Sequence, residues 1–132
     1  MADIFEVQII TPERVFYQGQ AGMVELTTVE GDMGVYPNHI PLTAVIAPGI
    51  VTITEADEKK KCAVHAGFVE ILPDKVTILA EVAEWPDEID VNRARQAEDR
   101  ARERLAAKDT NLDVMRAELA LKRALVRQDI LL

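Results

Sequence analysis

The spacing of the apolar residues changes once along this chain, near residue 85, and this change limits the folds that the chain can adopt. Before it, apolar and polar residues alternate, as in half-buried β-strands. The clearest runs contain Phe5, Val7 and Ile9, then Val51 and Ile53, then Val76, Ile78 and Ala80. After it, apolar residues recur every three or four positions, as on one face of a helix. The sequence therefore predicts an α+β chain, mostly β and then α.

Turn-forming residues divide the β part into short strands. They occur at Thr11-Pro12-Glu13, at Gln18-Gly19-Gln20 and at Pro73-Asp74, while the charged stretch 55–61 is typical of a solvated hairpin tip. Because no helical pattern separates these strands, the sequence indicates an antiparallel sandwich or barrel.

Two helices are predicted in the α part. Asp90 is placed to cap the first, whose apolar stripe is Val91, Ala94, Ala97, Ala101 and Leu105. The pattern breaks at 108–111, and Thr110 followed by Asp113 resembles a cap for the second. Its predicted apolar side is Leu112, Met115, Leu119 and Val126, with Ala117, Leu121 and Ala124 beside it. The short connection implies an antiparallel hairpin, which a seam made mostly of alanine would hold weakly.

Length and composition exclude several classes of protein. The 132 residues allow one domain, or a small domain with an appendage, and 48% hydrophobic residues allow a buried core. No apolar run approaches the roughly 20 residues that span a bilayer. The N-terminus lacks a secretory pattern, so we expect a cytosolic-type compartment. The single cysteine, Cys62, excludes an internal disulfide framework and a thiolate zinc cluster.

The net charge of −8 is unevenly distributed. Residues 1–85 carry 13 acidic and 5 basic side chains, whereas residues 86–132 carry 10 of each and contain eight of the nine arginines. The acidic first part opposes binding to nucleic acid, because phosphates would repel it. The arginine-rich second part could still bind a local anion, such as a nucleotide or an acidic protein surface.

The arginines of the two predicted helices recur at the same steps. Steps of seven and then four residues separate Arg93, Arg100 and Arg104, and again Arg116, Arg123 and Arg127. Such steps place side chains on one helix face. Two interpretations remain open, a solvated face with local ion pairs and an anion-binding face.

Residues 30–42, EGDMGVYPNHIPL, contain more glycine and proline than a strand tolerates and more apolar residues than a solvated loop needs. Glycine reaches backbone shapes that other residues avoid, and proline fixes φ. One interpretation is a rigid loop shaped for contact with a partner. The alternative is an internally packed loop with Tyr36 and Ile40 turned inward.

Several segments together resemble the epsilon subunit family of bacterial F-type ATP synthase. They are EGDMGVYPNHIPL, Ala47-Pro48-Gly49, HAGFVEILPDKVTILAEVAE, IDVNRA and RAELALKRAL, in that order along the chain. The resemblance implies an N-terminal antiparallel β-sandwich over residues 1–86 and a C-terminal antiparallel two-helix hairpin over residues 87–132.

The resemblance also implies a non-catalytic subunit of the rotary central stalk. The sandwich would lie beside the gamma subunit and touch the c-ring through Asp32 and His39. The hairpin would extend toward the alpha and beta subunits, reach beta through Arg104 and Arg116, and restrain ATP hydrolysis. The location implied is peripheral, at the cytoplasmic face of the bacterial plasma membrane, without insertion into lipid.

Some members of this family bind ATP, with or without magnesium, through an I/L-D-x-x-R-A motif, which residues 89–94 match. By resemblance, the adenine and ribose would lie among Glu84, Ile89, Asp90, Arg93 and Ala94, and the phosphates nearer Arg100, Arg123 and Arg127. Carboxylates accept the adenine amino hydrogens, and guanidinium groups suit phosphate oxygens. The chain has no G-x-x-x-x-G-K-[ST] motif, so ATP would be a regulatory ligand rather than a substrate.

Two other classes of protein were weighed. An enzyme is disfavoured because Cys62 and His65, three residues apart on a strand, would face opposite sides, and because no residues have metal-ligand spacing. We therefore expect no catalytic residue and no metal site. An unrelated β-sandwich binding module with a helical adaptor is compatible with composition and periodicity alone.

Overall fold

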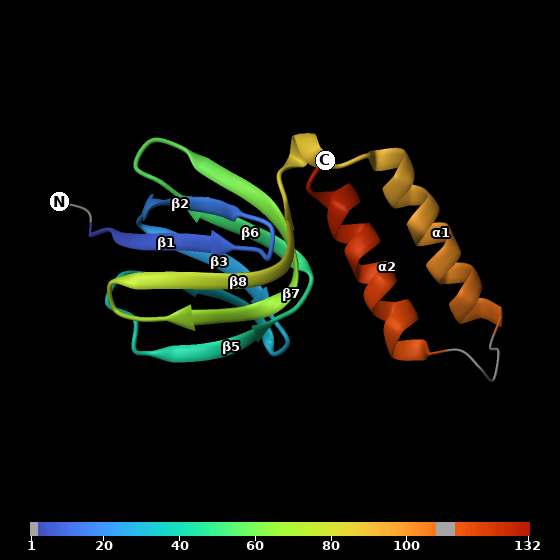
Figure 1. Cartoon of the computed structure of the whole chain (residues 1–132), viewed down its shortest axis with the longest axis horizontal. Coiled ribbons are helices and arrows are strands. Elements are labelled where there is room, and N and C mark those ends of the chain that lie inside the picture. The colour runs from blue at the N-terminus through green and yellow to red at the C-terminus, as the bar shows by residue number, and fades with distance from the viewer. Residues whose placement is uncertain (1–2, 108–112) are drawn as a thin grey trace.

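The computed structural model describes residues 3–107 and 113–132, which form eight strands and then a helical hairpin (Figure 1). The elements are β1 (Phe5–Ile10), β2 (Val15–Ala21), β3 (Met23–Thr28), β4 (Gly31–Val35), β5 (Leu42–Ile46), β6 (Gly49–Thr54), β7 (Lys59–Ile71), β8 (Lys75–Glu84), the 3-10 turn η1 (Pro86–Glu88), α1 (Val91–Ala107) and α2 (Val114–Asp129). The predicted fold class, a β-sandwich followed by two helices, is confirmed.

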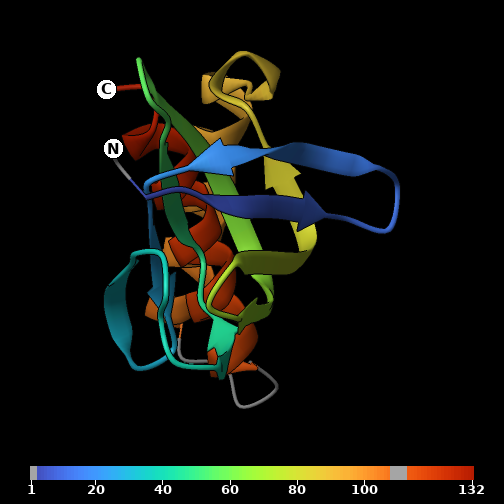
Figure 2. The same ribbon diagram turned by 90° about the vertical axis from the view of Figure 1, so that its left-hand side faces the viewer.

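The strands form two layers that the long strand β7 joins. One layer has the order β2-β1-β8-β7-β5, and β4, β3 and β6 form the other (Figure 2). The first half of β7 pairs with β6 and the second half with β5. Between these halves Ala66 and Gly67 have positive φ values of 64° and 135°. At Gly67 a Cβ atom would collide with the Leu79 carbonyl oxygen, so only glycine fits.

The core lies between the layers and contains the alternating residues that the sequence indicated. Val7, Ile9, Val76 and Ile78 are completely buried. Burial of each such side chain contributes about 1.5–3 kcal/mol, so this cluster is a major source of the stability of the sandwich.

Three local predictions about the strands were wrong. Gln18–Gln20 lie inside β2 rather than in a turn, where Gly19 leaves room for the Tyr17 hydroxyl group. Gly31–Val35 form β4, paired antiparallel with β3, despite their two glycines. The β1–β8 pair is parallel, whereas antiparallel pairing was expected.

The helical hairpin lies at one end of the sandwich, with α2 between the sandwich and α1 (Figure 1). The predicted alanine seam is present: Ala94 and Ala101 of α1 and Ala117 and Ala124 of α2 are the buried residues of the described helices. The predicted apolar side of α2 was wrong, because Met115 and Leu119 are exposed. Leu112 lies outside the described residues.

An aspartate side chain caps the N-terminus of each helix. Asp90 Oδ1 accepts hydrogen bonds from the backbone N–H groups of Asn92 and Arg93, at 3.0 and 3.1 Å, so the predicted cap of α1 is present. Asp113 caps α2 by accepting from the Arg116 N–H at 3.0 Å. The sequence predicted Thr110 in that role, a residue outside the described part of the chain.

Candidate nucleotide site and contact surfaces

A cavity of about 350 Å³ lies where the last strand, the linker and both helices meet. Its lining contains seven of the eight residues expected at a nucleotide site, together with Glu88 and Ala97: Glu84, Ile89, Asp90, Arg93, Ala94, Arg100 and Arg127. The eighth, Arg123, is half-buried on α2 and does not line this cavity. Residues separated by more than 40 positions in sequence thus surround one space.

Glu84, at the end of β8, is one of three acidic residues that line this cavity, with Glu88 and Asp90. Its Oε1 atom accepts a hydrogen bond from Arg127 Nε at 2.7 Å and lies 2.9 Å from His65 Nε2. Partial burial raises the pKa of Glu84, but the hydrogen bonds from His65 and Arg127 outweigh it, so the net pKa lies below its usual value. Glu84 is therefore an ionised acceptor at neutral pH.

Arginines form the other wall of the cavity. Within residues 3–107 and 113–132, no acidic side chain lies within ion-pair distance of Arg93 or Arg100, whereas Arg127 is paired with Glu84. Two guanidinium groups at the edge of the cavity thus lack an anionic partner in this part of the chain. Both of these arginines are exposed, so their guanidinium groups can reach water or an anion.

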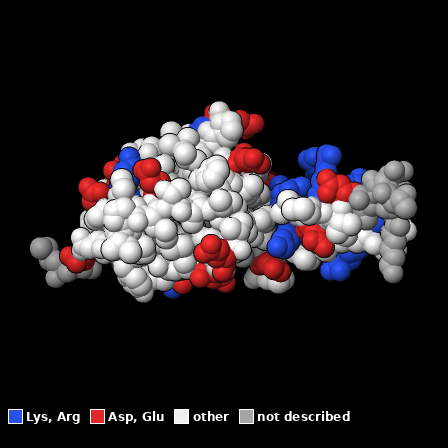
Figure 3. All heavy atoms as spheres, turned by 90° about the horizontal axis from the view of Figure 1, so that it is seen from below, with Lys and Arg blue, Asp and Glu red and all other residues white. Residues whose placement is uncertain are grey.

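Arg104 and Arg116 lie far from this cavity. Arg104 is in the last turn of α1, Arg116 is in the first turn of α2, and both are exposed. They flank the connection between the helices at the end of the hairpin distant from the sandwich. Figure 3 shows that Lys and Arg gather over the hairpin, while the sandwich face in that view carries few of them.

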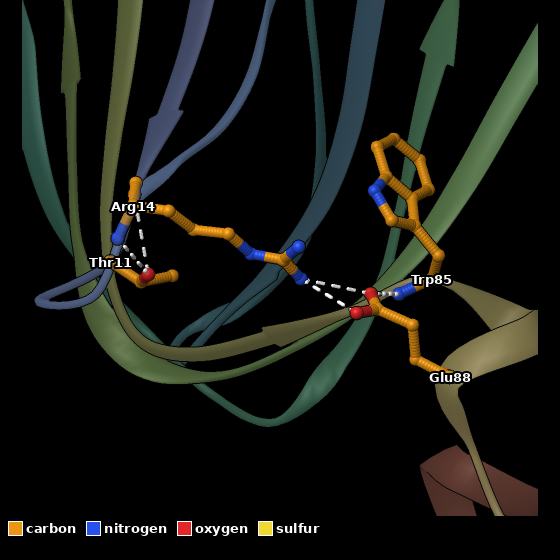
Figure 4. A network of polar contacts seen from close by, with 4 residues as sticks. All are labelled: Thr11, Arg14, Trp85 and Glu88. Atoms are coloured by element: carbon orange, nitrogen blue, oxygen red, sulfur yellow. Dashed lines mark hydrogen bonds and ion pairs between the residues drawn. The ribbon is translucent and has the colours of Figure 1, made fainter.

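The linker between the two parts is fixed to the sandwich as far as Glu88 (Figure 4). Arg14 Nη2 donates to both carboxylate oxygens of Glu88, at 2.9 and 2.8 Å, and the Trp85 backbone N–H donates to Glu88 Oε1 at 2.9 Å. The Trp85 ring stacks on Phe16 with centroids 4.4 Å apart. Ile89 follows directly, donates its backbone N–H to the Pro86 carbonyl at 3.2 Å and lines the cavity.

The structure does not bring Asp32 and His39 together. Asp32 is near the start of β4 and accepts a hydrogen bond from Thr27 Oγ1 at 2.7 Å. His39 follows the other end of β4, in a loop where the Asn38 N–H donates to the Pro73 carbonyl. Tyr36 and Ile40 are 61% and 76% exposed, so the alternative with these residues turned inward was wrong.

An exposed apolar row crosses the outer face of the larger layer. Strand pairing places its members side by side: Val45 with Phe68, Phe68 with Leu79, Leu79 with Ile10, and Ile10 with Val15. Phe68, Leu79 and Val15 are each at least half exposed. This row was not predicted from the sequence, although Phe68 and Leu79 interrupt the alternation of their strands and thus gave a signal. Together these residues form an unpartnered apolar surface.

The described residues were expected to contain neither a membrane span nor a metal site. They contain no helix long and apolar enough to cross a membrane. They also contain no group of histidine, cysteine and acidic side chains arranged to hold a metal ion.

A β-sandwich carrying an arginine-rich helical hairpin is the two-domain architecture of one class of ATP synthase subunit. Residues 4–86 match the family described as ATP synthase, Delta/Epsilon chain, beta-sandwich domain, and residues 87–130 match its long alpha-helix domain. The chain belongs to this family, as an epsilon chain of ATP synthase. The resemblance found in the sequence is thereby confirmed, and an unrelated binding module is excluded.

Curated relatives support this placement along the whole chain. The chain is 49% identical to the ATP synthase epsilon chain of Halalkalibacterium halodurans over 125 residues, covering 94% of each. It is 42% identical to that of Caldanaerobacter subterraneus, covering 98% of this chain and 95% of the relative.

Solved structures share the fold. A chain of the Euglena gracilis mitochondrial ATP synthase, in a structure of OSCP, F1 and the c-ring, superposes with a TM-score of 0.85 at 22% identity, covering 97% of this chain and 81% of that one. A chain from the central stalk and c-ring structure of the Tetrahymena thermophila enzyme gives a TM-score of 0.63 at 14% identity, covering 97% and 96%.

Proposed function

We propose that this subunit is non-catalytic and that its hairpin binds ATP as a regulatory ligand, which keeps the hairpin folded and prevents it from restraining ATP hydrolysis. The observation that carries the proposal is the cavity at the junction of the two domains. It combines an ionised carboxylate, a capping aspartate and three arginines, drawn from β8, the linker, α1 and α2.

The chemistry of the cavity suits a nucleotide. Its volume of about 350 Å³ is within the range of small-molecule sites. Only one oxygen of Glu84 takes part in the hydrogen bonds above, so Oε2 can accept an adenine amino hydrogen. Arg93 and Arg100 can donate to phosphate oxygens, and Arg127 can join them by leaving Glu84.

Such a ligand would favour the folded hairpin because its contacts come from elements that separate when the hairpin opens. A ligand at 100 times its dissociation constant stabilises the state that binds it by about 2.7 kcal/mol. Each alanine of the seam contributes only about 0.8 kcal/mol, the value of one buried methyl-sized group. Bound ATP is therefore comparable in free energy to the seam itself and can decide between the two arrangements.

In the released state, the hairpin would restrain the catalytic subunits. Arg104 and Arg116 are exposed at its distant end, and extension from Ile89 would carry them farthest from the sandwich. Guanidinium groups suit acidic segments, and we assign these two residues to contact with the beta subunit. Reversing both charges should relieve inhibition in a reconstituted enzyme without changing ATP binding by the isolated subunit.

The apolar row is assigned to the gamma subunit. A cross-strand row of large apolar side chains on a soluble protein is typical of a protein interface, and a stable neighbour in the stalk would cover it. Phe68→Glu should abolish co-purification with gamma, whereas Phe68→Leu, which keeps an apolar group, should retain it. Retention by both variants would contradict the assignment.

The two predicted c-ring residues require separate tests, because they are at opposite ends of β4. We assign Asp32 and His39 to the ring, with Asp32 pairing basic side chains and His39 making a hydrogen bond. Alanine at either position should weaken assembly onto the ring. Unchanged assembly and coupling for one variant would remove that residue alone. Contact with the ring would hold the subunit peripherally at the cytoplasmic face of the bacterial plasma membrane.

Calorimetry of the full chain with MgATP tests the nucleotide proposal. We expect heat of binding, no turnover, and loss of affinity in Arg93→Gln and Glu84→Gln. Two exposed residues that do not line the cavity provide matched controls, Arg95→Gln on the same helix and Glu81→Gln on the same strand. Absence of binding by the unmodified chain, or equal losses in the controls, would overturn the proposal.

A further inference from the structure

His65 is a buried histidine that the function described so far does not use. It belongs to β7 and is 1% exposed. Its Nε2 atom lies 2.9 Å from Glu84 Oε1, while Nδ1 is buried with no hydrogen-bond partner among the described residues. A buried polar atom without a partner lowers stability, a loss that an apolar side chain of similar size would avoid, so the side chain is not simply a packing residue.

The arrangement fixes the role of each ring nitrogen. Because the Glu84 carboxylate is an acceptor, Nε2 is the ring nitrogen that donates its N–H, and Nδ1 is the buried nitrogen without a partner among the described residues. A leucine would fill a similar volume and remove the unpartnered atom. What the histidine provides that leucine cannot is one N–H directed at Glu84.

His65 and Arg127 donate to the same oxygen of Glu84, but only Arg127 can leave. Arg127 lines the cavity and comes from the hairpin, whereas His65 does not line the cavity and comes from the sandwich. When Arg127 turns to a phosphate, the hydrogen bond from His65 remains. Oε2, which neither residue contacts, stays available to accept a hydrogen bond from a ligand.

We infer that His65 is a positioning residue for the nucleotide site, holding the Glu84 carboxylate in place to accept a hydrogen bond from the ligand while Arg127 exchanges partners. This inference rests on the proposed nucleotide function. A preorganised acceptor loses less conformational entropy on binding than a freely rotating one, so affinity should depend on a group that never touches the ligand.

The role of the His65 N–H group can be tested by two substitutions, one that removes the N–H and one that replaces it. His65→Leu removes the N–H, whereas His65→Gln can place an amide N–H near the position of Nε2. By calorimetry with MgATP, we expect His65→Leu to bind at least about tenfold more weakly, the factor that corresponds to 1.4 kcal/mol. His65→Gln should remain within about threefold of the unmodified chain.

A double-mutant cycle separates positioning from general structural support. In a Glu84→Gln background the carboxylate is absent, so adding His65→Leu should cause no further loss of ATP affinity. A merely structural role would lower affinity in both backgrounds. Thermal denaturation of every variant checks that the sandwich is folded, and the glutamine variant keeps the test decisive if the leucine variant unfolds.

The outcomes distinguish this inference from the function on which it rests. If the unmodified chain fails to bind MgATP, the nucleotide proposal fails and the role of His65 fails with it. If the unmodified chain binds, the inference alone is overturned by normal affinity in His65→Leu, by equal losses in the leucine and glutamine variants, or by an undiminished effect in the Glu84→Gln background.

Discussion

Arg127, in the last turn of α2, donates a hydrogen bond to Glu84 at the end of β8 over 2.7 Å, and this contact joins the hairpin to the sandwich. A different hydrogen bond joins the two helices to each other, from Gln128 Nε2 of α2 to Glu98 Oε1 of α1, at 2.8 Å. Among the described residues, the two helices also pack through the buried alanines of the seam. Arg127 and Gln128, which donate these hydrogen bonds, both lie in the last turn of α2.

Enlarging one residue of the seam should open the hairpin. Ala101 is 2% exposed, and overpacking a close contact typically costs about 1–3 kcal/mol. We expect Ala101→Leu to increase hydrogen exchange of the α2 amides and to weaken ATP binding, while the sandwich amides remain protected. The matched control is Ala106→Leu at an exposed position of the same helix. Protected α2 amides in Ala101→Leu would show that the seam does not limit docking.

Acidification should undock the hairpin. The pKa of Glu84 is lowered in the folded state, so its stabilising effect is fully present above the ordinary value of 4.5 and is lost as the pH falls through the folded-state pKa. Glu98 acts in the same direction, because hydrogen bonds from Gln128 and Arg102 lower its pKa.

The measurement is hydrogen exchange of α2 at matched intrinsic rates between pH 7 and pH 3. Protection should fall only below about pH 4.5, and Glu84→Gln should already show reduced protection at neutral pH and a flatter acid response. Loss of protection on raising the pH instead would contradict this assignment.

The two contacts of the linker should differ in strength. Arg14 and Glu88 form a well-oriented pair, but their side chains are 48% and 38% exposed, so Arg14→Gln should lower the free energy of unfolding by less than about 1 kcal/mol. Trp85→Ala removes a ring stacked on Phe16 and should cost about 2 kcal/mol or more. Urea unfolding measures both values, and a larger loss for Arg14→Gln would reverse the proposed order.

Cys62 should be unreactive while the sandwich is folded. Burial raises the pKa of its thiol to about 12, so only about one molecule in ten thousand carries the thiolate at pH 8. A thiol reagent should modify Cys62 only at the rate of unfolding, and urea should accelerate the reaction. Rapid modification of the native chain would show that this strand opens locally.

Much of the fold could be predicted because the spacing of apolar residues along the sequence determines which side chains of a strand or helix are buried. The alternation of Val76, Ile78 and Ala80 gave the buried face of β8, and Asp90 gave the start of α1. The errors have physical causes. Gly19 resembled a turn residue, yet it lies within a strand because a neighbouring tyrosine fills its space. Met115 and Leu119 share a helix face that alanine packing leaves outside.

Some residues of the nucleotide site could be predicted because they belong to a short sequence motif. Residues 89–94 identified the linker and the start of α1, and the family resemblance added Glu84, Arg100 and Arg127, which the fold brings to the same cavity. His65 could not be found in this way. Its relation to Glu84 depends on the register of β7 against β8, and no local pattern records that pairing.

The distance between the two helices tests the central claim most directly. Spin labels at Arg95→Cys and Glu118→Cys occupy exposed positions of α1 and α2, and buried Cys62 stays unlabelled. In the presence of the gamma subunit, we predict one short distance with MgATP and an additional longer distance without it. A single short distance under both conditions would contradict a hairpin whose arrangement is controlled by nucleotide.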